Sequence, residues 1–403
     1  MIKREETVKH TRMQSIREYF PDQNTVLFDI ETTGLSWRTS HVYLIGVLFF
    51  REGEWRMTQW FLDKPSEEKE MLHAFGNFVV SALASAPGSG FGSILLHYNG
   101  DMFDLPYLRH KCEFYGLPDP FEEMESTDIY RKIRPLQKVL GLASLKQKSV
   151  EDFLGIQRED RYGGGELIPV YQRFLQTREK DLLNLLFLHN HDDVIGMAEI
   201  LPILSYPCFF EGGFCAAGVS EQNDFEDGRM RFRMRADHSF PVPVRSEKDG
   251  IVLEMGGGDD PTEGVMLVRT WKTEMKHFFP DYKNYFYLPE EDRAIHKDVA
   301  IYVDPDHREK AKASTCYQKA TGTFLPQFSE QIVPAFYREY KKKPAFFRWE
   351  DLERLQEKEG ERKEETREKT NKKMKDNARE AAKGENRLMD QYLLELLDYM
   401  AGK

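Results

Sequence analysis

The chain has 403 residues and carries 57 basic and 68 acidic side chains, which gives a formal net charge of −11 at pH 7. At roughly 150 residues per domain, this length predicts two or three domains and excludes a single small module. The charged fraction of 31% and the hydrophobic fraction of 40% are typical of globular proteins. Because the mean charge is acidic, any contact with a polyanion must come from a local basic patch.

From the sequence we expect neither a membrane span nor a secretory signal. Its longest uninterrupted apolar run, residues 42–50, has about half the length that a spanning helix needs, and residues 1–20 lack an apolar segment. We therefore expect a cytoplasmic protein without membrane association. Four cysteines without C-x-x-C spacing are too few for a disulfide scaffold, and we expect reduced, structural thiols. A metal or redox role for the Cys208 and Cys215 pair is the alternative.

The first half of the chain has the pattern of a mixed α/β sheet. Three β-branched and aromatic runs separated by turn residues come first, and strands interleaved with helices follow. This order predicts a sheet with an antiparallel edge. The expected elements are strands over 25–32, 43–50, 55–62 and 94–99, a helix with Ser66 as its N-cap, a helix over 104–115, and consecutive helices over 142–204.

The second half changes in character. Short strand signals over 229–271 predict a smaller β-rich domain. Residues 351–386 carry 11 acidic and 11 basic side chains, which indicates an exposed helix or a disordered linker, and an amphipathic helix over 388–400 ends the chain. The expected divisions are an N-terminal extension over 1–23, an α/β domain over 24–205, a β-rich domain of unknown role over 206–349, and a charged helical tail over 350–403.

Acidic residues occur at three separate places in the α/β domain. Asp29 and Glu31 are two residues apart on the first expected strand, so both side chains lie on one face near its C-terminal end. Asp104 begins a helix after a strand and a turn, and His189 and Asp193 are i, i+4 neighbours on a late helix. Each place alone has a structural explanation: a surface pair, a helix N-terminus, or a His–Asp pair.

Taken together, these acidic residues predict a divalent cation site. None of the four carboxylates has a basic partner nearby in sequence. A set of carboxylates suits Mg²⁺ or Mn²⁺ better than Zn²⁺. Two such ions about 4 Å apart activate a water and stabilise the leaving oxygen in phosphodiester cleavage.

Three motifs resemble those of the DEDD, or DnaQ-like, exonuclease branch of the RNase H-like superfamily. They are FDIETTG at 28–34, N-G-x-x-F-D-x-P at 99–106 and H-N-x-x-D-V at 189–194, in the family's order and separations. Further blocks, DIYRKIRPL, SVEDFLGIQRED, GGGELIPVYQRFL and LLFLHNHDDV, are similar to the YprB-like ribonuclease H-like domain. The resemblance covers roughly residues 20–205 and implies an RNase H-like mixed sheet flanked by helices over 24–205.

The resemblance also implies a mechanism and its residues. Asp29, Glu31, Asp104 and Asp193 would be ligands of two Mg²⁺ or Mn²⁺ ions, with Asp29 bridging them, and His189 would hold or deprotonate the attacking water. The family places Tyr four residues before the last Asp, or His five residues before it. Here a histidine stands four residues before Asp193, so His189 takes the tyrosine position with the chemistry of a histidine.

Contacts to nucleic acid are expected around these motifs. Residues 129–150 carry a net charge of +6, although a solvated helix face is the alternative. The candidate contacts are Thr32, Thr33, Gly34, Asn99, Phe103, Arg131, Lys132, Arg134 and Lys146. Arg158, Arg161 and Tyr162 with the glycines at 163–165 form either a flap over the substrate or an ordinary surface loop. The Lys- and aromatic-rich stretch 271–289 is either a stacking platform for single strands or core.

The function expected from the sequence is therefore that of a metal-dependent nuclease, and specifically of a 3′–5′ exonuclease acting on DNA or RNA. A structure-selective endonuclease of the same fold is one alternative. A non-catalytic nucleic-acid-binding scaffold is the other, but such a scaffold has no need for four clustered carboxylates. The sequence does not predict protein partners.

Overall fold

The computed structural model describes residues 1–403 except 10–12, 22–23, 85–92, 123, 158–161, 220–227, 331, 353 and 355–386. Two compact units divide the chain: unit 1 is Met1–Pro207 with Phe240–Val242, and unit 2 is Cys208–Ser239 with Pro243–Lys403. The expected flap residues Arg158 and Arg161, and most of the charged stretch 351–386, lie outside the described residues.

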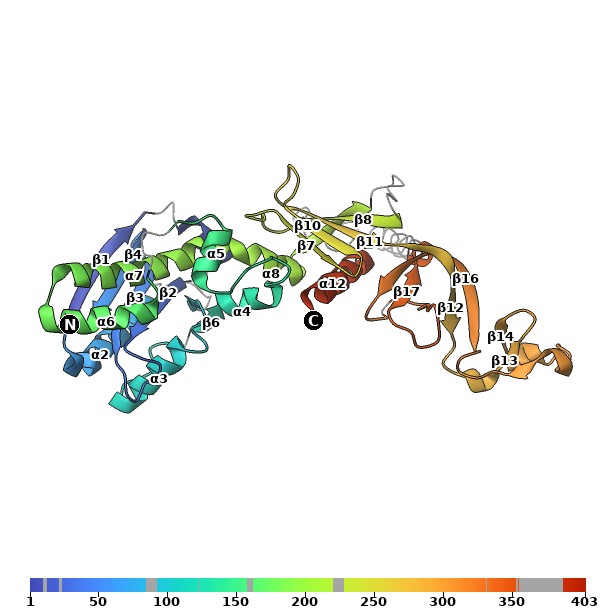
Figure 1. Ribbon diagram of the computed structural model, residues 1–403, viewed down its shortest axis with the longest axis horizontal. Helices are drawn as coiled ribbons and strands as arrows, with labels where there is room; N and C mark the ends of the chain where they lie inside the picture. The colour runs from blue at the N-terminus through green and yellow to red at the C-terminus, as the bar shows by residue number, and fades with distance from the viewer. Residues whose placement is uncertain are drawn as a thin grey trace, which may run out of the picture. The chain divides into compact units, whose positions relative to one another are not determined.

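Unit 1 is built on a six-stranded mixed sheet with the order β1-β4-β3-β2-β5-β6 (Figure 1). Strands β2 to β4 pair antiparallel in succession, and β5 and β6 extend the sheet in parallel from β2. The predicted mixed sheet with an antiparallel edge is thus confirmed. Its strands are β1 (Ile2–Val8), β2 (Asn24–Thr32), β3 (Val42–Arg51), β4 (Glu54–Phe61), β5 (Ser93–His97) and β6 (Glu125–Asp128).

Strand β1 was not expected, because residues 1–23 were assigned to an extension outside the domain. It pairs antiparallel with β4 along its whole length, from Ile2 opposite Phe61 to Val8 opposite Trp55. Residues 3–7 are exposed and charged or polar, as is usual for an edge strand that must not recruit a further strand. The segment therefore lacks the apolar alternation by which strands are found in sequence, although it completes the sheet.

Helices cover both faces of this sheet. Helix α7 (Lys180–Glu199) packs on β2 and β3 beside α6 (Gly164–Thr177), as Figure 1 shows, and α2 (Glu68–Ala84) packs against β3 and β4. Ser66 lies inside a short 3-10 helix (Pro65–Glu67) and is not the N-cap of α2. The other helical elements are α1 (Gln14–Tyr19), α3 (Asp104–Tyr115), α4 (Ile129–Ile133), η3 (Arg134–Leu136), α5 (Gln147–Phe153), η4 (Leu201–Leu204) and α8 (Ser205–Phe210).

One helical stretch, residues 180–210, has the length and apolar composition that a membrane span needs. However, 78% of its most apolar window is buried within the protein. Burial of this kind is what the core helix of an α/β sheet shows, and in unit 1 α7 is that helix.

In its described residues, unit 2 contains three antiparallel sheets, a C-terminal helix and the short helical elements η6 (Tyr282–Asn284), α9 (Lys297–Ala300) and η7 (Pro305–His307). The largest sheet has the order β7-β8-β11-β10-β9, and the two smaller ones have the orders β12-β16-β17 and β14-β13-β15. The strands are β7 (Phe214–Val219), β8 (Arg229–Ala236), β9 (Val244–Lys248), β10 (Ile251–Met255), β11 (Glu263–Arg269), β12 (Trp271–Phe278), β13 (Tyr285–Leu288), β14 (Arg293–His296), β15 (Glu309–Lys310), β16 (Tyr317–Gln327) and β17 (Ala345–Arg348). The predicted β-rich character of this half is confirmed.

Helix α12 (Arg387–Ala401) packs on the β-rich part instead of forming a separate tail. The fully buried ring of Tyr392 lies 5.8 Å from that of Phe232 on β8 and 4.9 Å from that of Phe347 on β17. The Asp390 carboxylate accepts a hydrogen bond from the backbone N–H of Ala216 on β7. The predicted amphipathic helix is therefore present, and its apolar face completes the core of unit 2.

A buried ion pair fixes α3, the helix that begins at Asp104. Glu68 at the start of α2 and Lys111 on α3 are 3.0 Å apart, and their side chains are 1% and 5% exposed. The Glu68 carboxylate also accepts hydrogen bonds from the N–H of Val42 and the hydroxyl of Tyr115. Burial opposes ionisation of Glu68, but its hydrogen bonds, with that to His41 first among them, outweigh burial and hold its pKa below the usual 4.5.

Replacing Lys111 by methionine should lower the free energy of unfolding by about 3 kcal/mol, because it leaves the buried Glu68 charge without its cation. Since the pKa of Glu68 is lowered on folding, its contribution is complete above pH 4.5 and is lost as the pH falls through the lower, folded-state value. Urea unfolding at pH 7 and pH 4 measures both effects. The double variant Lys111→Met/Glu68→Gln should recover part of the loss, and a Lys111→Met protein as stable as wild type would contradict the prediction.

Candidate metal centre

The first part of the candidate site lies on β2. Asp29 pairs with Gly46 and Glu31 with Leu44 on β3, so both carboxylates lie on the same face of the sheet, which α7 covers. The pairing shifts between Glu31 and Thr32, where β2 ends. The hydroxyl of Tyr43 lies 3.4 Å from Oε2 of Glu31, to which it donates a hydrogen bond.

The second part is the turn between β5 and α3, which delivers Asp104. The Asp128 carboxylate accepts hydrogen bonds from the backbone N–H of Asn99 at 2.8 Å and of Asp101 at 3.4 Å. Asn99 has a φ of 61°, a left-handed conformation that asparagine tolerates. Gly100 donates its N–H to Nδ1 of His97, and a Cβ on Gly100 would lie only 2.7 Å from that nitrogen. The turn thus ends with Asp104 at the first position of α3, where it is 8% exposed.

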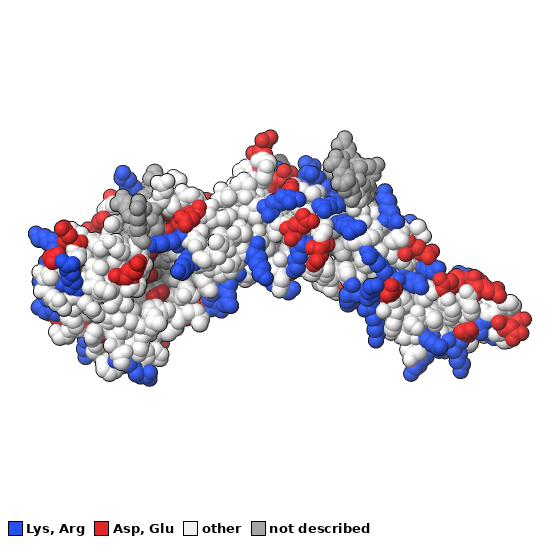
Figure 2. All heavy atoms as spheres, viewed as in Figure 1, with Lys and Arg blue, Asp and Glu red and all other residues white. Residues whose placement is uncertain are grey.

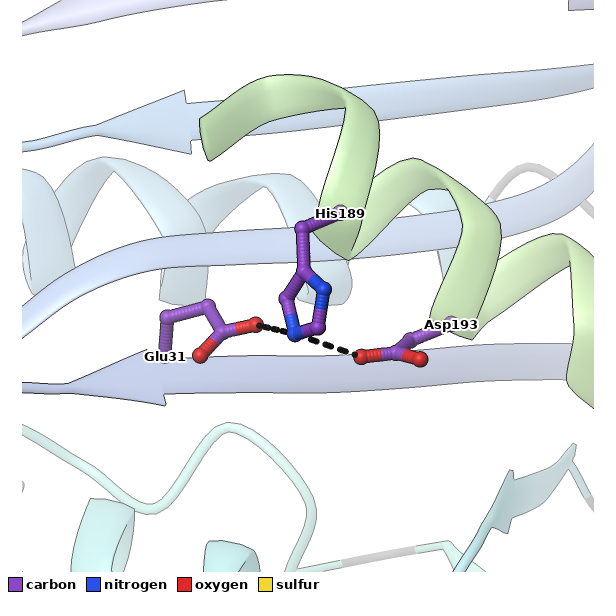
Figure 3. Close-up of side chains that lie close together, drawn as sticks. All are labelled: Glu31, His189 and Asp193. Carbon is purple, nitrogen blue, oxygen red and sulfur yellow. Dashed lines mark ion pairs between the residues drawn. The ribbon is translucent and has the colours of Figure 1, made fainter. Parts of the chain in front are cut away.

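The third part is α7, which carries His189 and Asp193 one turn apart. Figure 3 shows the imidazole of His189 between the carboxylates of Glu31 and Asp193. Its Nε2 lies 3.2 Å from Oε1 of Glu31 and 3.2 Å from Oδ2 of Asp193. The three side chains place their ligand atoms within 4.8 Å of one another, close enough to share a metal ion.

Asn190 is a site residue that sequence reasoning missed. Its Nδ2 donates a hydrogen bond to Oδ2 of Asp29 at 3.0 Å, and its Oδ1 accepts one from Nε2 of Gln59 at 2.9 Å. Gly46 makes room for this amide, since a Cβ at that position would overlap the Asn190 side chain. The available signals were an asparagine directly after His189 and a single glycine within the apolar run of β3.

The carboxylates act strongly on one another. The pKa of Asp29 is raised well above its usual 3.8, and burial is the largest cause. The negative charges of Asp193, Glu31 and Asp104 raise it further, and only the hydrogen bond from Asn190 lowers it. The three charges that raise the pKa of Asp29 most are therefore negative, and they come from three elements that are far apart in sequence.

Neighbouring negative charges also act on Asp104. Burial, the neighbouring charge of Asp128 and that of Asp193 raise its pKa to about 7. A buried carboxyl group with carboxylates as neighbours is costly to ionise without a compensating cation. Hard oxygen donors in this arrangement fit Mg²⁺, Mn²⁺ or Ca²⁺, so the residues present suit a divalent cation.

A second group, His97, Asp101 and Asp128, also places its ligand atoms within 4.8 Å of one another. Its members already have hydrogen-bond partners: Asp101 accepts from Ser126 at 2.9 Å and from Arg131 at 2.7 Å, and Asp128 accepts from backbone N–H groups. These contacts shape the turn before Asp104. The group therefore serves to position that carboxylate.

The loop after β2, where Thr32 and Thr33 were expected to contact nucleic acid, uses both hydroxyls internally. The Thr32 hydroxyl donates to the carbonyl of Gly34, and that of Thr33 accepts the N–H of His41. The backbone of Gly34 is half-buried. Phe103 is also half-buried and packs against the core.

The expected basic patch lies on α4, η3 and the start of α5. Arg131, Lys132, Arg134 and Lys146 are all exposed, and the Arg131 guanidinium is paired with Asp101 at 2.7 Å. Lys146 precedes Gln147, whose Nε2 donates to the backbone carbonyl of Asp193. The structure thus brings this end of the patch next to α7, and the roles of these residues stay predictions.

The glycines at 163–165, expected in a flap or surface loop, lie at the N-terminus of α6. A Cβ on Gly164 would lie 3.5 Å from Oε2 of Glu31 and 4.0 Å from Nε2 of His189. Backbone without side chains therefore borders the site. The backbone of α6 thus approaches Glu31 and His189 closely, and both of these side chains are buried.

Comparison with known proteins agrees with this architecture. Residues 26–205 match a family described as RNase_H superfamily, and this stretch contains the three elements of the site. No curated protein matches the chain. Residues 26–205, which lie in unit 1, are therefore similar to this superfamily, and the predicted fold class, a mixed α/β sheet with helices followed by antiparallel β sheets, is confirmed.

If the carboxylates hold a cation, Asp29→Asn should change stability in opposite directions with and without metal. Without metal the variant should be more stable by about 1 kcal/mol or more, because a neutral amide removes the burial cost and the repulsion that raise the pKa of Asp29. With Mn²⁺ or Mg²⁺ the wild type should gain stability and the variant should gain less, since it has lost a ligand.

Thermal unfolding in chelator and in millimolar metal measures both effects. Asp181→Asn on the exposed first turn of α7 is the matched control and should behave as wild type. An equal metal-induced shift in Asp29→Asn and wild type would contradict the assignment.

Proposed function

We propose that unit 1 is a divalent-metal-dependent nuclease that hydrolyses phosphodiester bonds. The observation that carries the proposal is the gathering of Asp29, Glu31, Asp104 and Asp193, all buried or half-buried, beside the imidazole of His189. Burying several like charges destabilises a fold unless they have a task that needs them. An RNase H-like domain over residues 26–205 supports a nucleic-acid substrate.

The finer assignment, to the DEDD branch and to a YprB-like exonuclease, rests on the three sequence motifs. In it, Asp29, Glu31, Asp104 and Asp193 hold two Mg²⁺ or Mn²⁺ ions. When bound, such ions supply the positive charge that activates the attacking water and stabilises the leaving oxygen. The polarity that the resemblance implies is 3′ to 5′.

The chain's own residues would perform the remaining tasks. His189 would hold the attacking water and accept its proton at Nε2, the ring nitrogen that faces the two carboxylates. Asn190 would fix the orientation of Asp29 through its hydrogen bond to Oδ2. The exposed side chains of Arg134 and Lys146 would bind substrate phosphates.

The reaction can be tested with 5′-labelled single-stranded and duplex DNA and RNA in the presence of Mg²⁺ or Mn²⁺. Products that shorten stepwise from the 3′ end are expected. Discrete internal cuts would instead assign a structure-selective endonuclease, and intact substrate with all four nucleic acids would overturn the proposal in favour of a binding scaffold.

The variants Asp29→Asn and Asp193→Asn should reduce cleavage to background, because each removes a proposed ligand while retaining the size of the side chain. Both proteins should keep the circular dichroism and the unfolding transition of a folded chain. Asp181→Asn, on the same helix as Asp193, should cleave at the wild-type rate. Cleavage by Asp29→Asn at the wild-type rate would show that the activity lies elsewhere.

His189→Ala should lower the cleavage rate on the order of 10² to 10⁴-fold, the usual contribution of a positioned proton acceptor. Its metal-induced thermal shift should remain, because the carboxylates are intact. A His189→Ala protein that loses the thermal shift together with activity would identify the imidazole as a ligand. Cleavage by His189→Ala at the wild-type rate would show that the imidazole only packs beside the site.

A further inference from the structure

Strand β8 of unit 2 carries an arginine at every second position. Its sequence alternates Arg229, Arg231, Arg233 and Arg235 with Met230, Phe232 and Met234. The apolar residues are buried, and Arg231, Arg233 and Arg235 are exposed, so the four guanidinium groups lie on one face of the five-stranded sheet. Alternate residues on a strand are roughly 6.6 Å apart, which makes this a regular row roughly 20 Å long.

This arginine row is only partly neutralised. Arg229 lies 3.6 Å from Glu247, and Arg235 lies 3.7 Å from Asp260. In the part of the chain that the structure describes, Arg231 and Arg233 form no ion pair. Figure 2 shows Lys and Arg side chains gathered over the region of β8 and β11, with acidic side chains among them. Two unpaired guanidinium groups at the centre of an exposed sheet are typical of an anion-binding surface.

The row continues toward an aromatic pocket. Arg229 pairs across the ladder with Arg269 on β11, whose guanidinium lies 5.6 Å from the ring centroid of Trp271. Trp271 lines a pocket of about 310 Å³. Its other lining residues include Phe346, Tyr399 and the exposed cations Arg338, Lys342 and Lys343.

We propose that the arginine row on β8 binds the phosphates of single-stranded nucleic acid and that the Trp271 pocket accepts one of its bases. Regularly spaced guanidinium groups suit a polyanion with regularly spaced charges. The Arg338 guanidinium lies over the rings of Trp271 and Phe346, at 4.8 and 5.2 Å from their centroids, so a base in the pocket would stack on this guanidinium and gain a cation–π contact. A duplex keeps its bases stacked inside and cannot use such a pocket.

This inference deepens the proposed function, because it assigns a substrate-binding surface to unit 2, and it rests on nucleic acid being the substrate. It can be tested without cleavage. Binding of a fluorescent oligothymidylate to the full chain in EDTA is measured by anisotropy over a range of salt concentrations. The result then does not depend on whether unit 1 is a nuclease.

The double variant Arg231→Ser/Arg233→Ser should weaken binding roughly tenfold or more near 0.1 M salt. The slope of log affinity against log salt should fall by about 1.4, the value for two lost phosphate contacts on a single strand. The matched control is Arg293→Ser/Lys310→Ser, which removes the same charge from exposed positions on β14 and β15 and should bind as wild type. Equal affinity and equal salt dependence in both double variants would overturn the proposal that the arginine row binds phosphates.

A separate substitution tests whether the Trp271 pocket accepts a base. Arg338→Ser should weaken binding of the single strand more than binding of a duplex of the same length, because only an unpaired base can reach Trp271. Tighter binding of the duplex by wild type, or tighter binding of anionic phosphatidylserine vesicles than of the oligothymidylate, would overturn the choice of a single strand. If the oligothymidylate binds as expected but no cleavage is found, the binding surface on unit 2 is supported and the proposed nuclease function is overturned.

Discussion

Mutual repulsion among buried carboxylates is the constraint on which unit 1 depends. Asp29 is half-buried, and burial together with three further carboxylates raises its pKa. The charges of these carboxylates oppose their gathering, since bringing like charges into a region of low polarity is unfavourable. Their positions must therefore be imposed by the packing of β2, the turn before α3 and helix α7.

The groups that impose these positions are neutral or internally balanced. Gln59 anchors α7 by donating to the carbonyl of Phe187 and to Asn190, which in turn holds Asp29. The Glu68–Lys111 ion pair holds α3 in place. The position of Asp104, the first residue of α3, follows from this contact. Opposite charges are thus paired in the supporting contacts, whereas at the site three carboxylates raise the pKa of a fourth. Such a local conflict within an otherwise consistent fold is a usual sign of a functional site.

An element or site residue could be predicted from the sequence where it buries apolar side chains or where its partner is close in sequence. Strands β2 to β4 bury apolar side chains, so their pattern is visible, and i, i+4 spacing places His189 and Asp193 together without further information. Strand β1 buries little, and β6 (Glu125–Asp128) has the sequence ESTD, so neither carries a hydrophobic signal although both belong to the sheet. Asn190 could not be distinguished from a surface asparagine, because its contact with Asp29 spans 161 residues of sequence. Its role required the register that puts Gly46 beneath it.

The net charge of −11 conceals two opposite electrostatic arrangements. Unit 1 concentrates carboxylates at one buried and half-buried site, whereas β8 in unit 2 displays a row of guanidinium groups to solvent. A nucleic-acid phosphate near Asp29 and Glu31 is repelled until cations offset their charge, so in the proposed nuclease substrate and metal must bind to unit 1 cooperatively. The arginine row needs no cation to attract a phosphate. Affinity held by unit 2 would therefore persist without metal, which separates retention of the strand from the metal-dependent step at the carboxylates.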